Sequence, residues 1–385
     1  MSAPVRLIIE AQRLFRPRKH GMDVVALELL RRLKQMPTSF KKEVVVKADE
    51  DRCLEASEHL GLTVLPAAFY PLWEQRKLPA YTESIPGSVL HCTGNTAPLF
   101  SKTPLIVTIH DLIFLEENYL FKKNGGSLYQ RFGNVYRSLI VPRVARRAKH
   151  IITVSHFQRN LIMKRLNVLP EKISVVYNGA DERFFKQYSS EELQAALKQY
   201  GIDTTPYIFF LANTEPRKNT DGVLKAFKHF CETYPSQSLN LVIKGLTEEQ
   251  LQQKLQQTGT AGISHRIRRV GYIEYDDLPK LYQAAALLWF PSFTEGFGLP
   301  IVEAMAGGVP VLTSSCSVMP EIGGDAAVYI DPNQPETWVT PTYQLLTDMQ
   351  FRNTSSAKGR IQASRFTWDQ SLKQLMDVYQ QVLVS

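Results

Sequence analysis

Short apolar runs rich in β-branched residues alternate with amphipathic stretches along the whole chain, and this alternation limits the fold more than any other feature. It is typical of βα units that build parallel sheets, so the class is α/β. The first half predicts strands at 6–9, 43–47, 89–92, 105–109, 150–154 and 173–176. The pattern restarts at 207–211, 239–244, 267–270, 287–290, 309–313 and 327–330. Because 385 residues exceed what one hydrophobic core usually organises, we expect two domains.

The join between the domains is expected in 180–199, where the Asn178-Gly179 turn leads into polar, charged sequence. We therefore predict one Rossmann-like domain over residues 1–185 and a second over 186–367, with a last helix over 368–385. Ligands of such sheets bind at the carboxyl ends of the strands, so both domains would present their loops to a shared central cleft. An amphipathic helix is predicted between the first two strands, where Val25, Leu29 and Leu33 recur at four-residue spacing.

The cysteines and the N-terminus indicate a cytoplasmic protein. Four cysteines lie far apart without a CxxC pair, which favours neither a zinc site nor a disulfide framework. The N-terminus has only a short apolar run before Glu10 and no small-residue cleavage site, and no run approaches the ~18 apolar residues of a spanning helix. We expect a chain that is neither exported nor integral to a membrane.

Positive charge is concentrated in the first half. Residues 1–185 hold 28 Lys and Arg against 17 Asp and Glu, whereas 186–385 hold 17 against 20. Such a basic half suggests peripheral contact with anionic lipid at the inner face of the membrane, and a solvated basic surface is the alternative. No RNA-binding or zinc-finger motif accompanies the charge, so we expect no nucleic-acid partner.

The most informative segment is 291–310, which follows a predicted strand. Gly296 and Gly298 permit a tight loop, Pro300 suits the first helical turn, and Gly307-Gly308 ends the helix. The amides near Gly298 would bind an anion, and the helix dipole favours a phosphate there.

Two glutamates of this segment are candidate ligand-binding residues. Glu295 lies in the loop and Glu303 lies eight residues later, inside the helix. A buried carboxylate that accepts hydrogen bonds from a diol is a common way to bind a ribose. A capping or surface ion-pair role for each glutamate is the alternative.

The run from Glu295 to Glu303 resembles the E-x7-E segment of retaining GT-B glycosyltransferases, in glycosyltransferase family 4 (glycosyl transferases group 1), among bacterial mannosyl- and rhamnosyltransferases. Further segments resemble the family in the same order, so the resemblance covers nearly the whole chain; they are 108–112, 152–156, 176–181, 210–219 and 270–273. The resemblance implies an N-terminal acceptor domain, a C-terminal nucleotide-sugar donor domain, and a final helix that crosses back to the first domain.

The resemblance also implies roles for individual residues. Glu303 would bind the ribose hydroxyls, Glu295 the transferred sugar, and Arg217 with Lys218 the diphosphate. Cations in a loop after a strand, with Pro216 fixing the turn, suit a pyrophosphate on physical grounds as well. The remaining expected donor contacts are Tyr272, Ile273, Gly296, Phe297, Gly298 and Leu299.

In three places the chain differs from the family pattern or carries a weaker match. Many relatives have an arginine six residues before the lysine, where this chain has Ala212. Gly21 matches a glycine loop near the donor phosphates, but the usual second glycine is missing. His110, at the end of a predicted strand, matches an active-site histidine that contacts the sugar, although a lone histidine is more often structural.

Asp49-Glu50-Asp51 has the D-x-D form of a metal site. We interpret it as the cap of a following helix and expect no metal and no other cofactor. The predicted function is retaining transfer of a hexose from a nucleotide-diphosphate sugar, with GDP-mannose favoured over UDP- or dTDP-hexoses, to a glycan or lipid-linked acceptor in surface polysaccharide synthesis. A sugar-nucleotide epimerase, a phosphorylase and a non-catalytic sugar-nucleotide-binding module are the alternatives.

Overall fold

In the computed structural model, residues 5–17, 19, 21–66, 69–115 and 128–384 are described. The chain divides into two compact units, Met1–Asn178 with Trp368–Ser385, and Gly179–Thr367. Residues 179–185, predicted in the first domain, belong to the second. The reason is that Ala180 N donates a hydrogen bond to Phe366 O at 2.9 Å, so the chain enters and leaves the second unit at one place.

The first unit is built on a parallel sheet of seven strands in the order β3-β2-β1-β4-β5-β6-β7. All six strands predicted in this half are present, and the short edge strand β3 was not predicted. The strands are β1 (Arg6–Glu10), β2 (Lys41–Val46), β3 (Gly61–Val64), β4 (Ser88–Cys92), β5 (Leu105–Ile109), β6 (His150–Thr153) and β7 (Ile173–Val175).

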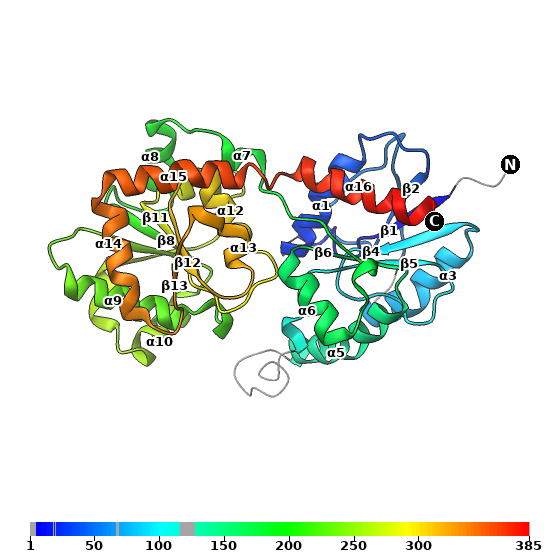
Figure 1. The fold of residues 1–385 in the computed structure, drawn as a ribbon, viewed down its shortest axis with the longest axis horizontal. Coiled ribbons are helices and arrows are strands. Elements are labelled where there is room, and N and C mark those ends of the chain that lie inside the picture. Colours follow the sequence, from blue (N-terminus) through cyan, green and yellow to red (C-terminus); the bar gives the residue numbers. More distant parts are fainter. Residues whose placement is uncertain (1–4, 18, 20, 67–68, 116–127, 385) are drawn as a thin grey trace. The chain divides into compact units, whose positions relative to one another are not determined.

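Helices cover both faces of this sheet (Figure 1). On one face α1 (Gly21–Leu33) and α16 (Trp368–Val384) pack in a core with Leu7 and Ile9. The other face is covered by α3 (Leu78–Glu83), α5 (Leu128–Arg147) and α6 (His156–Leu166). The shorter helices are α2 (Tyr70–Leu72), η1 (Trp73–Lys77), η2 (Ile113–Leu115) and η3 (Pro170–Lys172).

The last helix, α16, returns to the first unit, as predicted. Arg32 Nε of α1 donates to Asp369 Oδ1 at 2.9 Å, and the buried His91 ring lies 2.7 Å from Tyr379 Oη. Burial lowers the pKa of His91 to about 3, so this ring is neutral and holds α16 through hydrogen bonds rather than charge.

The second unit is built on a parallel sheet of six strands in the order β10-β9-β8-β11-β12-β13. Every predicted strand of this half is confirmed. They are β8 (Tyr207–Leu211), β9 (Asn240–Lys244), β10 (Ile267–Val270), β11 (Leu287–Phe290), β12 (Val311–Ser314) and β13 (Val328–Ile330). The core includes Trp289 and Trp338, whose rings meet edge to face at 5.7 Å.

Helices surround this sheet as well (Figure 1). They are α7 (Glu182–Phe185), α8 (Ser190–Gln199), α9 (Thr220–Thr233), α10 (Glu248–Gln257), α11 (Leu278–Ala284), α12 (Leu299–Ala306), α13 (Met319–Gly323), α14 (Val339–Thr347) and α15 (Met349–Ala363), with the turns η4 (Pro216–Lys218), η5 (Ala261–Arg266), η6 (Gly324–Ala326) and η7 (Pro335–Trp338).

Both sheets reverse their strand order at one point. In the first, β1 lies between β2 and β4; in the second, β8 lies between β9 and β11. The connections from these neighbouring strands leave toward opposite faces, which opens a crevice at the carboxyl ends where ligands of doubly wound sheets bind. The loops after β1, β4, β8 and β11 are therefore the first places to look for a site.

Candidate functional site

In the second unit, the loops after β8 and β11 meet at the reversal point. β8 leads into the turn η4, which carries Arg217 and Lys218, and β11 leads into the loop 291–298. Phe293 N donates to Arg217 O at 2.8 Å, so the two loops are joined through their backbones. The structure thus brings together residues that are 78 positions apart in sequence.

Glu295 lies between the two cations. Its Oε2 is 2.7 Å from Arg217 Nη1 and its Oε1 is 2.6 Å from Lys218 Nζ. Arg217 Nε also contacts Glu215 Oε2 at 2.6 Å. The side chains of Arg217, Lys218 and Glu295 are at most 19% exposed, so little water screens these charges.

The two cations decide the charge of Glu295. Burial by itself would raise the pKa of this carboxyl group, but the charges of Lys218 and Arg217 outweigh it, and the pKa lies below its ordinary value. Glu295 is therefore a carboxylate at neutral pH, and it is a weak base because its ion pairs with Arg217 and Lys218 stabilise the charged form.

Asn219 holds the two loops in place, and the sequence analysis missed it. It adopts a left-handed conformation with φ 57° and caps α9, its Oδ1 accepting from Gly222 N at 3.2 Å. Its Nδ2 donates to Pro291 O at 3.3 Å and to Pro332 O at 2.8 Å. An asparagine directly before a helix was the available signal.

The start of α12 has the predicted form. Gly298 precedes the helix with φ 95°, which favours glycine, and no side chain caps this end. Backbone amides and the helix dipole there suit an anion, and anion binding at this place stays a prediction. Of the other predicted contacts in this loop, Phe297 is buried against Phe366 with ring centroids 5.7 Å apart, while Gly296 and Leu299 are half-buried.

Glu303 lies in α12 in surroundings unlike those of Glu295. Tyr282 Oη donates to Glu303 Oε2 at 2.8 Å, and Lys244 at the end of β9 contributes a more distant positive charge. Burial raises the pKa of Glu303 to about 7, against the opposing effects of Tyr282 and Lys244. Neither Tyr282 nor Lys244 was predicted, because each lies in a different βα unit and neither is in the motif.

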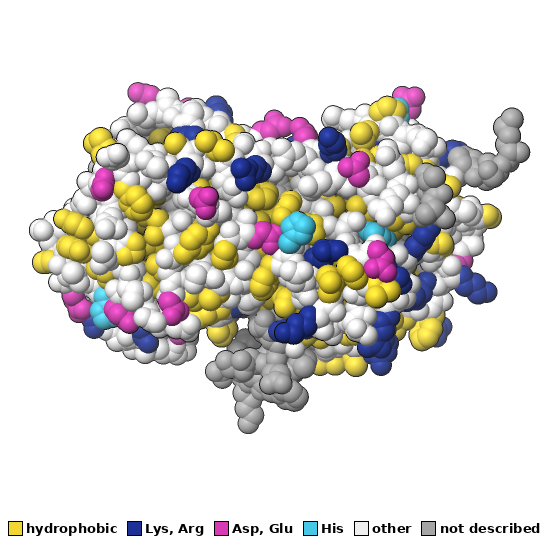
Figure 2. Space-filling view, viewed as in Figure 1, with side chains coloured by type: hydrophobic (Ala, Val, Ile, Leu, Met, Phe, Trp, Pro, Cys, Tyr) yellow, Lys and Arg dark blue, Asp and Glu magenta, His cyan; other side chains and the backbone are white. Residues whose placement is uncertain are grey.

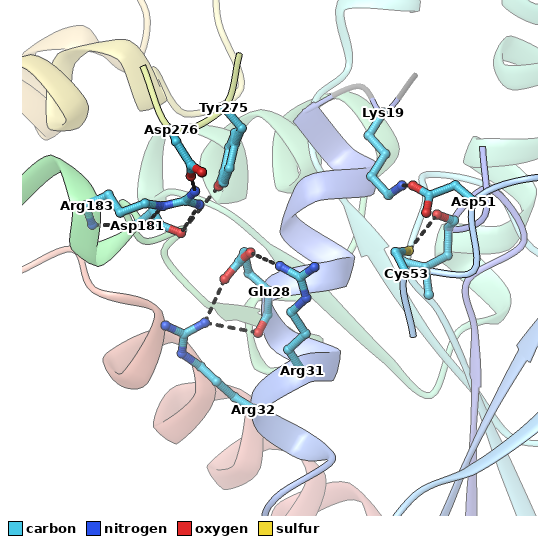
Figure 3. Close-up of polar contacts among 11 residues, drawn as sticks. Lys19, Glu28, Arg31, Arg32, Asp51, Cys53, Asp181, Arg183, Tyr275 and Asp276 are labelled. Atoms are coloured by element: carbon cyan, nitrogen blue, oxygen red, sulfur yellow. Dashed lines mark hydrogen bonds and ion pairs between the residues drawn. The ribbon is translucent and has the colours of Figure 1, made fainter. Parts of the chain in front are cut away.

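The loop 271–277 after β10 carries two predicted contacts. Tyr272 is 77% exposed, whereas Ile273 is buried. Arg183 connects this loop to the turn before α7: it pairs with Asp181 at 2.7 Å and with Asp276, and its guanidinium lies 3.8 Å from the centroid of the Tyr275 ring (Figure 3). Arg183 was not predicted, because it belongs to none of the motifs.

In the first unit, His110 follows β5 and is buried. Its backbone N donates to Asn95 Oδ1 at 2.8 Å, and its Nε2 lies 2.9 Å from Thr93 O, so the ring is held by the loop after β4. Burial lowers the pKa of His110, which keeps the ring neutral at pH 7. Gly21 is exposed at the start of α1, and a Cβ added there would meet nothing within 4 Å. The structure gives no steric reason for glycine at this position.

Glu10, which was not predicted, ends β1 at the reversal point of the same sheet. Its Oε1 accepts from Gln12 N at 2.7 Å, and burial raises its pKa to about 7. The Oε1 of Gln12 is buried and has no hydrogen-bond partner among the described residues. A glutamate at the end of an otherwise apolar strand was the signal that could have revealed this pair.

The D-x-D segment does not cap a helix, so that interpretation was wrong. The next regular element is β3, and Asp51 instead pairs with Lys19 (Figure 3), while Asp49 Oδ1 accepts from Glu50 N. Within the described ranges, no three His, Cys, Asp or Glu side chains are grouped to hold a metal ion.

Comparison with known proteins identifies both units. A family model described as Glycosyltransferase Family 4 matches residues 20–184, and one described as Glycosyl transferases group 1 matches 184–362. The chain is 35% identical over 238 residues to O-antigen chain mannosyltransferase B of Escherichia coli, covering 60% of each protein. It is 27% identical over 248 residues to O-antigen chain mannosyltransferase RfbU of Salmonella typhimurium, covering 64% of this chain and 61% of the relative. The matches thus span about three fifths of these relatives.

Solved structures share the fold of the whole chain. Anabaena HepE in complex with UDP-glucose has a TM-score of 0.73 at 17% identity, covering 98% of this chain and 99% of HepE. WaaG, a glycosyltransferase involved in lipopolysaccharide biosynthesis, has a TM-score of 0.69 at 16% identity, covering 97% and 99%. The fold is therefore GT-B, with two Rossmann-like units.

Proposed function

Because the chain belongs to the glycosyltransferases that combine a family 4 domain with a group 1 domain, we propose that it transfers a hexose from a nucleotide-diphosphate sugar to a hydroxyl group. The observation that carries the proposal is the contact of Arg217 and Lys218 with Glu295, in the loop that leads into α12 at the reversal point of the six-stranded sheet. Cations and free helix amides on one side of a crevice suit a diphosphate.

Mannose is the proposed sugar, GDP-mannose the proposed donor, and a glycan or lipid-linked glycan of surface polysaccharide the proposed acceptor. The support is that two relatives, at 35% and 27% identity, are O-antigen chain mannosyltransferases. UDP- and dTDP-hexoses are the alternative donors. By the family resemblance, Glu303 would bind the ribose, Glu295 the sugar, and Tyr272 with Ile273 the region of the base.

We propose that transfer retains the anomeric configuration without a protein nucleophile or a metal. Lys218, Arg217 and the start of α12 would stabilise the departing diphosphate, whose oxygen accepts the proton of the incoming hydroxyl on the same face of the sugar. Glu295, bound to two cations, is a weak nucleophile, which supports this route. His110 is proposed to contact the sugar as a neutral ring.

The test is a screen of nucleotide sugars in two assays. Thermal unfolding with GDP-mannose, UDP-glucose and dTDP-rhamnose identifies the donor, because a ligand that binds the folded state raises the unfolding temperature. Radiolabelled donor is then incubated with a lipid-linked glycan extract, and NMR gives the linkage of the product. A labelled glycoside with retained configuration is expected. Interconversion of the sugar nucleotide without transfer would indicate an epimerase, and release of a sugar phosphate would indicate a phosphorylase. Binding without any reaction would indicate a non-catalytic module.

We propose further that the first unit contacts anionic lipid through α5 and α6. These helices contain no Asp or Glu, and Arg143, Arg146, Lys164 and Arg165 are exposed. None of these four forms an ion pair with any described residue. On the face drawn in Figure 2, Lys and Arg side chains gather over the part of this unit where Figure 1 labels α5 and α6.

An apolar stripe accompanies this charge. Along α5, three apolar side chains recur at helical spacing and are about half exposed: Phe132 (50%), Val135 (49%) and Leu139 (53%). The ring centroids of Phe69 and Phe132 are 6.1 Å apart. Basic residues beside apolar ones suit an anionic membrane surface. No helix within the described ranges is long and apolar enough to cross a bilayer.

Liposome co-sedimentation tests this contact. Vesicles with anionic lipid should bind the protein more than neutral vesicles do, and 0.5 M salt should weaken binding because charge is screened over about 10 Å already at 0.1 M. Leu139→Ser should reduce binding, and Leu169→Ser, an exposed leucine outside α5 and α6, is the matched control. Equal binding to both vesicle types at both salt concentrations would contradict the proposal.

A further inference from the structure

The two proposed phosphate-binding cations are already neutralised by protein carboxylates. Arg217 contacts Glu215 and Glu295, and Lys218 contacts Glu295, all at 2.6–2.7 Å. Each of the two cations thus already has a carboxylate oxygen at ion-pair distance. A diphosphate entering this cluster would meet carboxylates as well as cations.

We infer that Glu295 and Glu215 compete with the diphosphate for Arg217 and Lys218, so that these carboxylates hold the cations in position and lower the affinity for the nucleotide. The inference rests on the proposed function, because it takes the ligand to be a nucleoside diphosphate. It concerns a property that the function does not require, namely that a carboxylate of the donor site opposes nucleotide binding.

The geometry favours competition over simple coexistence. Both carboxylate oxygens of Glu295 are used on cations, one on Arg217 and one on Lys218, in the manner of a bridging anion. Like charges in a poorly screened site repel strongly, so a phosphate close enough to accept from both cations would weaken these contacts. The side chain of Glu295 is 11% exposed, which keeps the screening weak.

Displacement would also change what Glu295 can do. While the ion pairs are intact, the carboxylate oxygens of Glu295 accept hydrogen bonds from the cations. When a phosphate binds the cations instead, these oxygens can accept hydrogen bonds from sugar hydroxyls. Nucleotide binding and sugar binding would thereby be coupled through a single side chain. A sugar nucleotide would bind the cations through its diphosphate and Glu295 through its sugar hydroxyls. A nucleoside diphosphate would form only the contacts with the cations.

Glu215 is a graded comparison within the same cluster. It forms an ion pair with Arg217, and its side chain is 41% exposed, compared with 11% for Glu295. Its opposition to the phosphate should therefore be weaker. Glu336 is exposed and forms no ion pair with any described residue, so its substitution changes the net charge equally without touching the cluster.

Calorimetric titration with GDP and with UDP at fixed ionic strength tests the inference on the wild type and on Glu295→Gln, Glu215→Gln and Glu336→Gln. For whichever nucleotide binds, Glu295→Gln should bind about tenfold more tightly than the wild type, and Glu215→Gln about threefold. Glu336→Gln should bind like the wild type. Transfer by Glu295→Gln should fall, which separates nucleotide affinity from catalysis.

Unchanged or weaker nucleotide binding by folded Glu295→Gln would overturn the inference. If that variant does not fold, Glu215→Gln decides: binding no tighter than that of Glu336→Gln would overturn it. If the wild type binds either nucleotide and the variants do not bind it more tightly, the inference is wrong and the proposed function is not contradicted. Failure of the wild type and all variants to bind either nucleotide would contradict the function and the inference together.

Discussion

The two sheets share one strand order but place different charges at the point where that order reverses. In the second unit Glu295 lies between Lys218 and Arg217, which keep its pKa below the ordinary value. In the first unit Glu10 accepts from the backbone of Gln12, and burial raises its pKa to about 7. The same topology thus supports a site rich in ion pairs and a site with little positive charge.

This difference indicates which ligand group each unit suits. A diphosphate needs cations and free amides, and the second unit has both. In the first unit the charge of Arg13 lowers the pKa of Glu10 only weakly compared with burial, and Arg13 lies 3.4 Å from Asp23 in an ion pair of its own. Neutral His110 and the Oε1 of Gln12, an acceptor without a hydrogen-bond partner among the described residues, suit hydroxyl groups instead.

The largest effect should come from removing a cation of the second unit. Lys218→Ala should lower kcat/KM for transfer by about 100-fold to 1000-fold, because a charged donor aimed at the leaving group is lost. Initial rates with the donor found in the screen measure this. Lys225→Ala, which removes an exposed lysine of α9, is the control and should stay within twofold. A comparable loss in the control, or less than a threefold loss in Lys218→Ala, would remove the distinction between the two sheets.

The same substitution at the two reversal points should change stability in opposite directions. At pH 8, Glu10→Gln should raise the free energy of unfolding by about 1–3 kcal/mol, because it removes a buried charge that the fold disfavours. Glu295→Gln should lower it by about 1–3 kcal/mol, because it leaves two cations without their partner. Urea titrations of both variants and the wild type give these values.

The sign of the pH dependence follows from the direction of each pKa shift. The folded-state pKa of Glu10 is raised from 4.5 to about 7, so the wild type loses stability as pH rises from 4.5 to 7, and Glu10→Gln should gain its advantage in that window. The pKa of Glu295 is lowered, so its contribution is present above 4.5 and disappears as pH falls below that value. Both variants destabilising the protein equally at pH 8 would contradict the comparison.

The fold could be predicted almost completely because each βα unit leaves a local signal. Buried strands such as 207–211 and 287–290 are continuous apolar runs, and their observed bounds match the prediction. The edge strand β3 was missed because Gly61–Val64 is half-exposed and too short to show a period. The unit boundary was misplaced by seven residues because a backbone hydrogen bond between Ala180 and Phe366 has no signature in sequence.

The candidate site was predicted residue by residue but not as a set of contacts. The family resemblance identified Glu295 and Glu303 in the segment 291–310, and Arg217 and Lys218 in the segment 210–219. It implied a separate ligand group for each of these pairs or residues. That Glu295 bridges the two cations depends on which strands are neighbours, and strand order cannot be read from local patterns. Glu10 was missed for the same reason: its burial becomes visible only once β1 is known to lie at the reversal point.

Glu303 allows the comparison to be sharpened within one unit. At pH 8, above the pKa of Glu303 of about 7, Glu303→Gln should weaken nucleoside diphosphate binding by about 1–2 kcal/mol, since a neutral amide replaces a charge-assisted acceptor at the ribose. This is opposite in sign to the change expected for Glu295→Gln. The 2′-deoxy nucleotide should bind the wild type more weakly and should show a smaller further loss with Glu303→Gln. Unchanged calorimetric affinity in the folded variant would show that Glu303 does not bind the ribose.

The smallest effect should follow from metal removal and from changes in the D-x-D segment. The charge of the diphosphate is assigned to Arg217, Lys218 and the start of α12, so the proposed mechanism leaves no step that needs a divalent ion. Asp51 pairs with Lys19 in the first unit, and its side chain is 39% exposed. Such a pair contributes at most about 1 kcal/mol to stability. Asp49→Ala and Asp51→Ala should therefore keep transfer within about threefold of the wild type.

The wild type should keep its rate in excess EDTA after metal stripping, and NMR should show retained configuration in the product. Loss of transfer in EDTA that manganese restores, together with an inverted linkage, would show that the cations of the second unit are not sufficient for the departing diphosphate.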